Sequence, residues 1–179
     1  MGRDKALLPW GGATLLDHAL ARLHAVAADV HILSGETVRY RDRGLPVHPD
    51  AAPDQGPLGG LAAALAAAHP RPVLLLAVDL PFVTVALLAG LARAVRHADV
   101  VVPVWSEGAE PLCAAYGPGC RAAVEEALRD GGRRMTSFWP ALAVRRLEGP
   151  ALAAYGDPAR LFLNVNEPDA YAAALRRAE

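Results

Sequence analysis

Short apolar runs alternate along the chain with longer stretches in which apolar residues recur every third or fourth position. Runs of the first kind are typical of buried strands when Gly, Asp or Pro follows them, and we predict strands at residues 30–33, 73–78 and 100–104. The longer stretches are typical of helices with one apolar face. Strands that alternate with helices predict an α/β fold.

Four predicted helix starts carry residues that suit the first turn of a helix. Thr14 and Asp17 have the spacing of a capping box, in which each side chain binds the other residue's backbone amide. Pro57 is well placed as the first residue of a second helix, because its missing amide hydrogen needs no partner there. Thr84 can cap a third helix, and Asn166 can start a last one.

The length and charge of the chain limit its domain count and its partners. A chain of 179 residues is long enough for one sizeable core, so we predict one domain over residues 1–179. Proteins that bind nucleic acid or an anionic membrane usually carry an excess of positive charge, whereas the formal net charge of this chain is -1. The charge therefore favours small-molecule partners. Apolar runs are broken well short of a membrane span, and we expect a soluble, cytoplasmic monomer.

Polar residues follow the predicted strands at the edge where open α/β sheets bind their ligands. Ser34 and Asp79 come directly after two such strands, and Asp50 follows a short run that ends at Val47. Magnesium takes one or two carboxylates together with substrate phosphates, so Asp79 before the turn at Pro81 suits that metal. Equally, Asp79 could serve only to bind turn amides.

Lys5 is the only lysine among 18 basic residues. A lysine amine is a compact point charge on a flexible stem, suited to reaching a phosphate. A lone lysine near a terminus is nevertheless usually a solvated side chain, and composition alone favours that interpretation. Asp50 or Asp54, ahead of a glycine-rich turn, could bind a ribose or a base, or could simply be caps.

Two further pairs of polar residues lie in the carboxyl-terminal third. Arg133 and Arg134 follow two glycines at a predicted loop-to-helix turn, where they suit a phosphate or a polar heterocycle or are solvated surface. Asn164 and Asn166 follow Phe162 at the end of a predicted strand and point to one face if the backbone is extended. The histidines lack zinc-ligand spacing and no nucleophile motif is present, so covalent catalysis has no candidate.

Taken in order, these motifs resemble those of the molybdenum cofactor guanylyltransferases over nearly the whole chain. The motifs are Met1-Gly-x-Asp-Lys5, the segment 50–60, Asp79-Leu-Pro81, Gly132-Arg-Arg134 and Phe162-x-Asn-Val-Asn-x-Pro168. The resemblance implies a Rossmann-like three-layer α/β/α nucleotidyltransferase fold with a mostly parallel central sheet. It also implies the transfer of GMP from GTP to molybdopterin with Mg²⁺, which releases pyrophosphate.

The resemblance also implies residue roles. Lys5 becomes a catalytic phosphate ligand of GTP, and Asp79 becomes a catalytic residue, the magnesium ligand and a nucleotide contact. Asp50 is implied as a nucleotide contact, as is Ser34, although the family commonly has Asn there. The residues implied to lie toward the pterin are Arg133, Arg134, Asn164 and Asn166. A phosphate monoester that attacks an α-phosphate is already anionic, so no general base is required.

Besides Ser34, the chain departs from the family in two further respects. A hydrophobic strand and a Leu-Ala-Gly-Gly loop precede the family's Met-Gly, so we expect that the reading frame continues upstream of Met1 and encodes them. Many relatives have His-Pro where this chain has Glu110-Pro111, and no role is assigned to Glu110.

Several alternatives remain open. They are transfer from CTP or to another phosphate acceptor, and a non-catalytic protein that binds the pterin or a nucleotide. Transient contacts with other proteins of molybdenum cofactor biosynthesis and with recipient molybdoenzymes are also expected.

Overall fold

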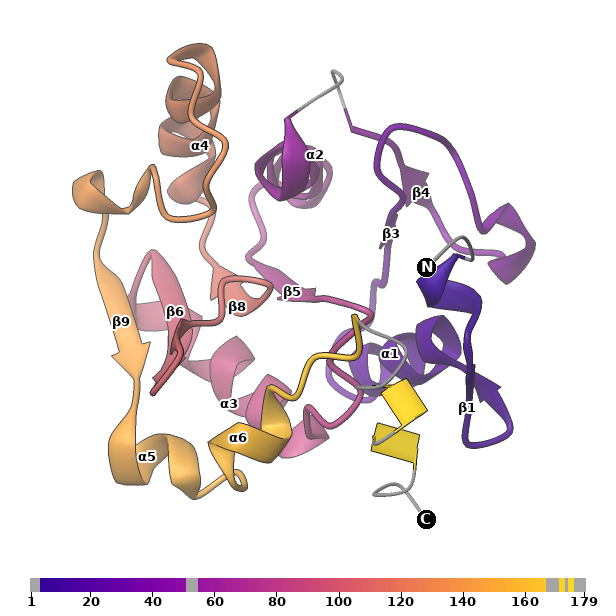
Figure 1. The fold of residues 1–179 in the computed structure, drawn as a ribbon. Helices are drawn as coiled ribbons and strands as arrows, with labels where there is room; N and C mark the ends of the chain where they lie inside the picture. Colours follow the sequence, from indigo (N-terminus) through magenta and orange to yellow (C-terminus); the bar gives the residue numbers. More distant parts are fainter. Residues whose placement is uncertain (1–3, 51–54, 167–170, 173, 176–179) are drawn as a thin grey trace.

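The computed structural model describes residues 4–50, 55–166, 171–172 and 174–175 (Figure 1). The strands are β1 (Pro9–Trp10), β2 (Ala13–Thr14), β3 (Ile32–Leu33), β4 (Val47–His48), β5 (Val73–Leu76), β6 (Val100–Trp105), β7 (Gly108–Ala109), β8 (Cys113–Tyr116) and β9 (Val144–Leu147). The helices are α1 (Leu15–His24), α2 (Gly56–Ala68), α3 (Val85–Ala94), α4 (Cys120–Arg129), α5 (Gly149–Ala153) and α6 (Pro158–Leu161). The 3₁₀ turns of the described residues are η1 (Lys5–Leu7), η2 (Arg41–Arg43), η3 (Val95–His97) and η4 (Trp139–Ala141).

The central sheet has the order β5-β8-β6, with β9 and β7 also paired to β6. Strand β8 is antiparallel to both β5 and β6, while β9 is parallel to β6. Strands β5, β6 and β9 therefore run in one direction, and β3 and β4 form a separate parallel pair. The predicted α/β class with a mostly parallel sheet is confirmed.

The predicted strand bounds need correction. Strand β3 covers only the last two residues of the predicted segment 30–33, and β5 ends at Leu76 rather than at residue 78. Strand β6 continues one residue beyond the prediction, to Trp105, because the hairpin with β7 pairs Trp105 with Gly108.

Apolar side chains cover both faces of the central sheet and give the fold its three layers. Successive strand residues point to opposite faces, so Val100 and Val102 face one layer of helices and Val101 faces the other. The first core contains α2 and α4 and includes Leu58, Leu61, Leu65, Val124, Tyr116 and Phe138. The second contains α3, α5 and α6 and includes Leu87, Leu88, Leu91, Leu152, Leu161 and Phe162.

The helix starts agree closely with the sequence pattern. Thr14 Oγ1 accepts from the amide of Asp17 at 3.2 Å, and the amide of Thr14 donates to Asp17 Oδ2 at 3.1 Å, which completes the capping box. Thr84 Oγ1 caps α3 by accepting from the amide of Leu87. Helix α2 begins one residue before Pro57, at Gly56, whose φ of 57° is in the left-handed region that favours glycine.

Two predictions near the carboxyl end are wrong. Phe162 is the C-cap of α6 and the segment 163–166 forms no strand, because the chain here packs Val165 into a core rather than onto a sheet edge. Arg133 and Arg134 follow α4 and lead into turns and η4 rather than into an α-helix. Residues 171–172 and 174–175 are helical as predicted, but the residues 167–170 that would start this helix lie outside the described part.

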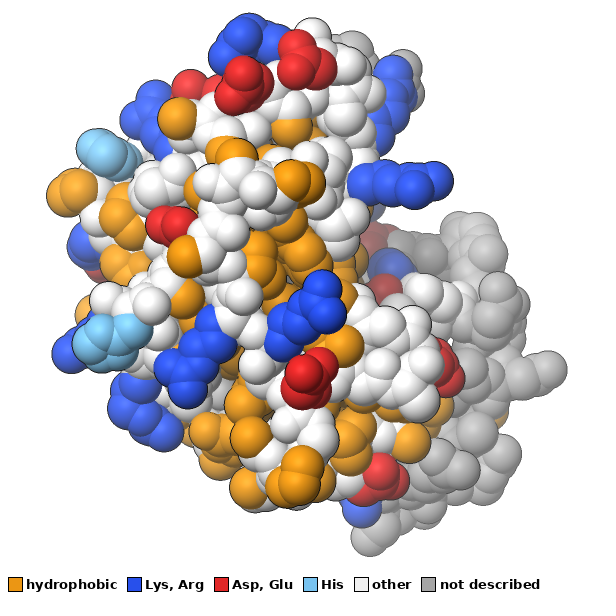
Figure 2. Space-filling view, turned by 90° about the vertical axis from the view of Figure 1, so that its left-hand side faces the viewer, with side chains coloured by type: hydrophobic (Ala, Val, Ile, Leu, Met, Phe, Trp, Pro, Cys, Tyr) orange, Lys and Arg blue, Asp and Glu red, His pale blue; other side chains and the backbone are white. Residues whose placement is uncertain are grey.

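The outer edge of the central sheet carries charge. Strand β9 pairs with β6, and its two middle residues, Arg145 and Arg146, are exposed. Charged side chains on an edge strand hinder the addition of a further strand. Basic and acidic side chains are scattered over this side of the molecule rather than gathered in one patch (Figure 2). Among the described residues, no helix has the length and apolar character needed to cross a membrane.

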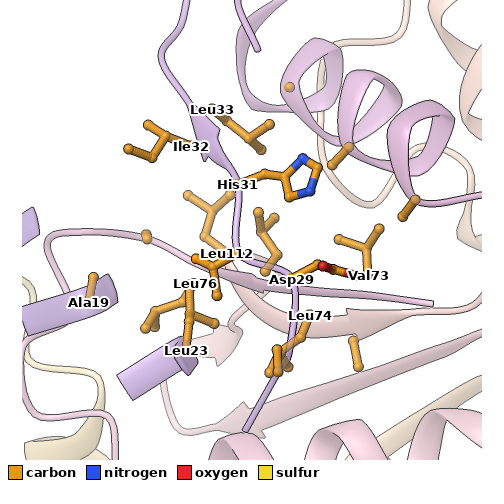
Figure 3. A pocket seen from close by; sticks show the side chains of 18 of the residues that line it. Ala19, Leu23, Asp29, His31, Ile32, Leu33, Val73, Leu74, Leu76 and Leu112 are labelled. Carbon is orange, nitrogen blue, oxygen red and sulfur yellow. The ribbon is translucent and has the colours of Figure 1, made fainter. Parts of the chain in front are cut away.

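An apolar groove of about 750 Å³ lies between β3 and β5. Side chains from β3, β5 and α1 project around it, including Leu33, Leu76 and Leu23 (Figure 3). Within the described residues, β3 pairs with β4 and β5 with β8, so neither strand uses the edge that borders the groove. An ion pair between Arg71 and Asp29 joins the segments that lead into the two strands.

Candidate active site

Three polar side chains from distant parts of the sequence meet beyond the end of β5. Lys5 Nζ donates to Asp79 Oδ2 and to Asn166 Oδ1, each at 2.7 Å. The side chain of Asp79 is 9% exposed and that of Lys5 is 43% exposed, so the carboxylate is buried while the amine borders solvent. The structure thus brings together three of the residues predicted for the site.

Asp79 is held in place by contacts from two other segments. Its carbonyl oxygen accepts from the amide of Val165 at 3.1 Å, which fixes the 163–166 segment beside the strand end. Arg22 of α1 donates to the carbonyl oxygen of Pro81 at 2.6 Å and so supports the turn that follows Asp79. Val165 itself is fully buried in a small core with Trp10 and Leu15.

Asn166 and Asn164 differ in their surroundings. Both side chains are exposed; Asn166, which follows the buried Val165, binds Lys5, and Asn164 precedes Val165 in the chain. Arg133 and Arg134 are exposed in the turns after α4. The assignment of these four residues to the pterin stays a prediction.

Lys5 is positioned by the turn in which it lies. Asp4 caps η1 by accepting from the amide of Ala6 at 3.1 Å through Oδ1. Its other oxygen, Oδ2, accepts from Tyr40 Oη at 2.7 Å and from Arg39 Nη1 at 3.2 Å. The loop after β3 therefore contacts the residue that precedes Lys5.

Ser34 and Asp50 lie together at the ends of β3 and β4. Ser34 is 3% exposed, and its Oγ has no hydrogen-bond partner among the described residues. The amide of Asp50 donates to the carbonyl oxygen of Gly35 at 2.8 Å, which ties the two strand ends together. Burial, with a contribution from the charge of Glu36, raises the pKa of Asp50. The structure places Asp50 at the border of the apolar groove, and Asp54 lies outside the described residues.

Sequence reasoning missed three residues that support the site. Arg22, Arg39 and Tyr40 gave no signal, because the chain is rich in arginine and their partners are far away in sequence. Glu110 accepts from Trp105 Nε1 at 2.9 Å. Burial raises the pKa of Glu110, the hydrogen bond from Trp105 opposes this effect, and the charges of Glu107 and, less strongly, Asp79 add to it.

The oxygen atoms at the cluster suit a hard divalent cation. Asp79 offers a carboxylate and Asn166 an amide oxygen, and Mg²⁺ accepts both kinds of ligand. Among the described residues, no group of three or more His, Cys, Asp or Glu could hold a metal by itself. A metal here would therefore need further ligands from water or from a bound phosphate.

The three-layer α/β fold holds a lysine against a buried carboxylate beyond a strand end, and its relatives place it in the nucleotidyltransferase class of enzymes. The chain belongs to the family described as the MobA-like NTP transferase domain, whose model matches residues 1–145. The family resemblance read from the sequence is confirmed.

Individual relatives agree with this placement. The chain is 34% identical over 168 residues to a probable molybdenum cofactor guanylyltransferase of Pelotomaculum thermopropionicum, which covers 94% of this chain and 82% of the relative. The crystal structure of molybdopterin-guanine dinucleotide biosynthesis protein A from Archaeoglobus fulgidus has a TM-score of 0.78 at 23% identity, over 99% of this chain and 90% of that one. The crystal structure of 2-C-methyl-D-erythritol 4-phosphate cytidylyltransferase from Thermus thermophilus has a TM-score of 0.72 at 23% identity, over 97% of this chain and 93% of that one. At such identities the two structures establish the fold alone.

Proposed function

We propose that the protein transfers GMP from GTP to molybdopterin, with release of pyrophosphate and formation of the guanine dinucleotide form of the molybdenum cofactor. The observation that carries this proposal is the convergence of Lys5, Asp79 and Asn166 at one strand end. Relatives that are about one third identical over most of the chain are named as molybdenum cofactor guanylyltransferases. This favours guanylyl transfer over other reactions of the nucleotidyltransferase class.

In this proposal the phosphates of GTP bind at the cluster. Lys5 Nζ, which now bonds to two oxygen acceptors, would turn toward a phosphate oxygen. Asp79 would hold Mg²⁺, with the amide oxygen of Asn166 beside it. The metal would supply neutralisation of the charge that develops on the triphosphate.

The nucleoside would lie near the ends of β3 and β4. The buried Ser34 Oγ has hydrogen-bonding capacity to offer a base or a ribose, since it lacks a partner in the described part of the chain. Asp50 borders the same region and would accept hydrogen bonds from the nucleoside. The pterin would lie on the other side of the phosphates, toward Asn164, Asn166, Arg133 and Arg134.

The reaction itself needs little proton chemistry from the protein. The terminal phosphate of molybdopterin is anionic at neutral pH and would attack the α-phosphate of GTP directly. The task of Lys5 and Asp79 is then to align the triphosphate and to offset its charge.

We further propose that the protein acts as a cytoplasmic monomer of one domain over residues 1–179, with transient contacts to other cofactor-biosynthesis proteins and recipient molybdoenzymes.

Pyrophosphate release with molybdopterin, Mg²⁺ and each of the four nucleoside triphosphates tests the proposal. We expect release with GTP, none without molybdopterin, and a loss of release when EDTA removes the metal. Release with CTP alone would contradict guanylyl transfer. Tight binding of the pterin with no turnover of any nucleotide would instead identify a non-catalytic binding protein.

A further inference from the structure

The carboxylate of Asp4 joins the turn that carries Lys5 to the loop that follows β3. Its Oδ1 accepts from the amide of Ala6, and its Oδ2 accepts from both Tyr40 Oη and Arg39 Nη1. Three donors on one carboxylate hold it much more firmly than a single bond would, because hydrogen bonds to charged groups are stronger than neutral ones. Asp4 is therefore fixed relative to both segments.

Arg39 links three groups of this region. Its Nη2 donates to the carbonyl oxygen of Ser34 at 3.2 Å while Nη1 binds Asp4. Its guanidinium carbon lies 5.3 Å from the centre of the Tyr40 ring, within the range of a cation–π contact. The planar fork of an arginine can make these contacts together, whereas a lysine amine could not reproduce their geometry.

Tyr40 adopts a backbone conformation that is unfavourable for its type. Its φ of 65° and ψ of 25° are left-handed, which costs a residue other than glycine on the order of 1 kcal/mol. The conformation brings the side chain to Asp4, and burial, with the hydrogen bond to Asp4, raises the pKa of Tyr40 to about 12. The phenol therefore remains a hydrogen-bond donor at neutral pH.

We propose that Arg39 and Tyr40 are positioning residues that hold Lys5 in reach of Asp79 by binding Asp4. Asp4 is the cap of η1 and precedes Lys5 directly, so a shift of its carboxylate moves the start of the lysine side chain. In the same loop, the carbonyl oxygen of Gly35 accepts from the amide of Asp50. The loop therefore joins the region of Ser34 and Asp50 to the turn that carries the lysine. The consequence for catalysis rests on the proposed function, whereas the geometric role does not.

The single lysine gives this proposal a direct test that needs no substrate. An N-hydroxysuccinimide ester acylates the amine of Lys5, which is 43% exposed, and trypsin cleavage after Arg3 separates the labelled lysine from the terminal amine. Mass spectrometry then gives the acylation rate of Lys5 in the full chain. The Asp79→Asn variant reports the rate of a lysine that has lost its ionic partner.

We expect Tyr40→Phe and Arg39→Gln to acylate several times faster than the wild type, because the amine spends less time bound to Asp79. Arg41→Gln changes a neighbouring arginine that is outside the contacts of Asp4 described above, and it should leave the rate unchanged. Arg39→Lys keeps one donor for Asp4 and should recover part of the protection. Tyr40→Phe loses one hydroxyl, and a melting curve for each variant confirms that the fold is retained.

Equal rates for wild type, Tyr40→Phe and Arg39→Gln, with a faster Asp79→Asn, would overturn the proposal. In the transfer assay the two variants should lower kcat on the order of tenfold and change KM for GTP less, since positioning acts on the reacting geometry. A fall in kcat without faster acylation would also overturn it. If the wild type transfers nothing, the proposed function fails, and the acylation rates still decide the role of Arg39 and Tyr40.

Discussion

The amide of Val165 donates to the carbonyl oxygen of Asp79 at 3.1 Å, and this backbone contact sets the site's geometry. It joins the end of the central sheet to a segment almost at the end of the described chain. Val165 is fully buried, so the residue after it, Asn166, is held where its amide meets Lys5. The arrangement of the cluster therefore depends on the packing of an apolar side chain.

We expect Val165→Ala to destabilise the fold by about 2 kcal/mol, through lost apolar burial and the cavity that remains. Activity should fall as well, since the segment that carries Asn166 loses its anchor. Denaturant unfolding and the transfer assay measure the two effects. Val85→Ala, at a position that is 40% exposed, is the matched control and should change little. Equal destabilisation by both changes would contradict the anchoring role.

The two asparagines are expected to differ in their kinetic roles. Asn166→Ala removes an acceptor of Lys5 and a proposed metal neighbour, so kcat should fall by roughly tenfold or more. Asn164→Ala changes an exposed side chain and should mainly raise KM for molybdopterin. Steady-state kinetics on both variants separate these effects. A larger loss of kcat in Asn164→Ala would show that the wrong asparagine has been placed at the phosphates.

How much of this could be predicted from sequence differs between elements. The caps of α1 and α3 and the apolar β5 and β6 were predictable, because hydrogen-bonding side chains and continuous apolar runs are local signals. Strand β8 was not, since its Cys-Ala-Ala-Tyr sequence has weak strand propensity and forms a strand because it pairs on both sides. Strand β9 carries Arg145 and Arg146 in its middle, which obscures the apolar pattern.

The candidate site was predictable only in part. Lys5 and Asp79 were identified from the motifs around them, and the structure places them 2.7 Å apart. The contacts of Arg22 with Pro81 and of Tyr40 with Asp4 span 59 and 36 positions of the chain. No local pattern marks such pairs, and the abundance of arginine removes the signal that composition would otherwise give.

Stability should depend on pH through His31. Burial is the main cause that lowers its pKa from 6.5, and the charges of His48 and Arg71 add to it while Asp29 opposes them. As the pH falls below about 6.5, the unfolded chain binds more protons at His31 than the folded one does. The free energy of unfolding therefore keeps its full value above that pH and decreases below it. His31→Gln should show a smaller fall in unfolding free energy than the wild type between about pH 7 and pH 5. Identical slopes would contradict this assignment.

The groove between β3 and β5 offers room for a further strand. Both bordering strand edges lack pairing within the described residues, and the lining of the groove is apolar. A central strand of a parallel sheet pairs along both of its edges and is buried on both faces, so such a strand suits this groove. An apolar strand and a glycine-rich loop joined ahead of Met1 should therefore raise Tm, by about 2–4 °C for each kcal/mol gained. A Gly-Ser extension of equal length is the control. The same Tm for both extensions would contradict this interpretation of the groove.

The central claim is that Lys5 and Asp79 together form the phosphate site of a guanylyl transfer. Its most direct test is the transfer of label from α-labelled GTP to molybdopterin with Mg²⁺, for the wild type, Asp79→Asn and Lys5→Arg. We predict labelled dinucleotide from the wild type and at least about a hundredfold slower formation by both variants, with melting curves that show a retained fold. Labelled product formed at the wild-type rate by either variant would contradict the claim.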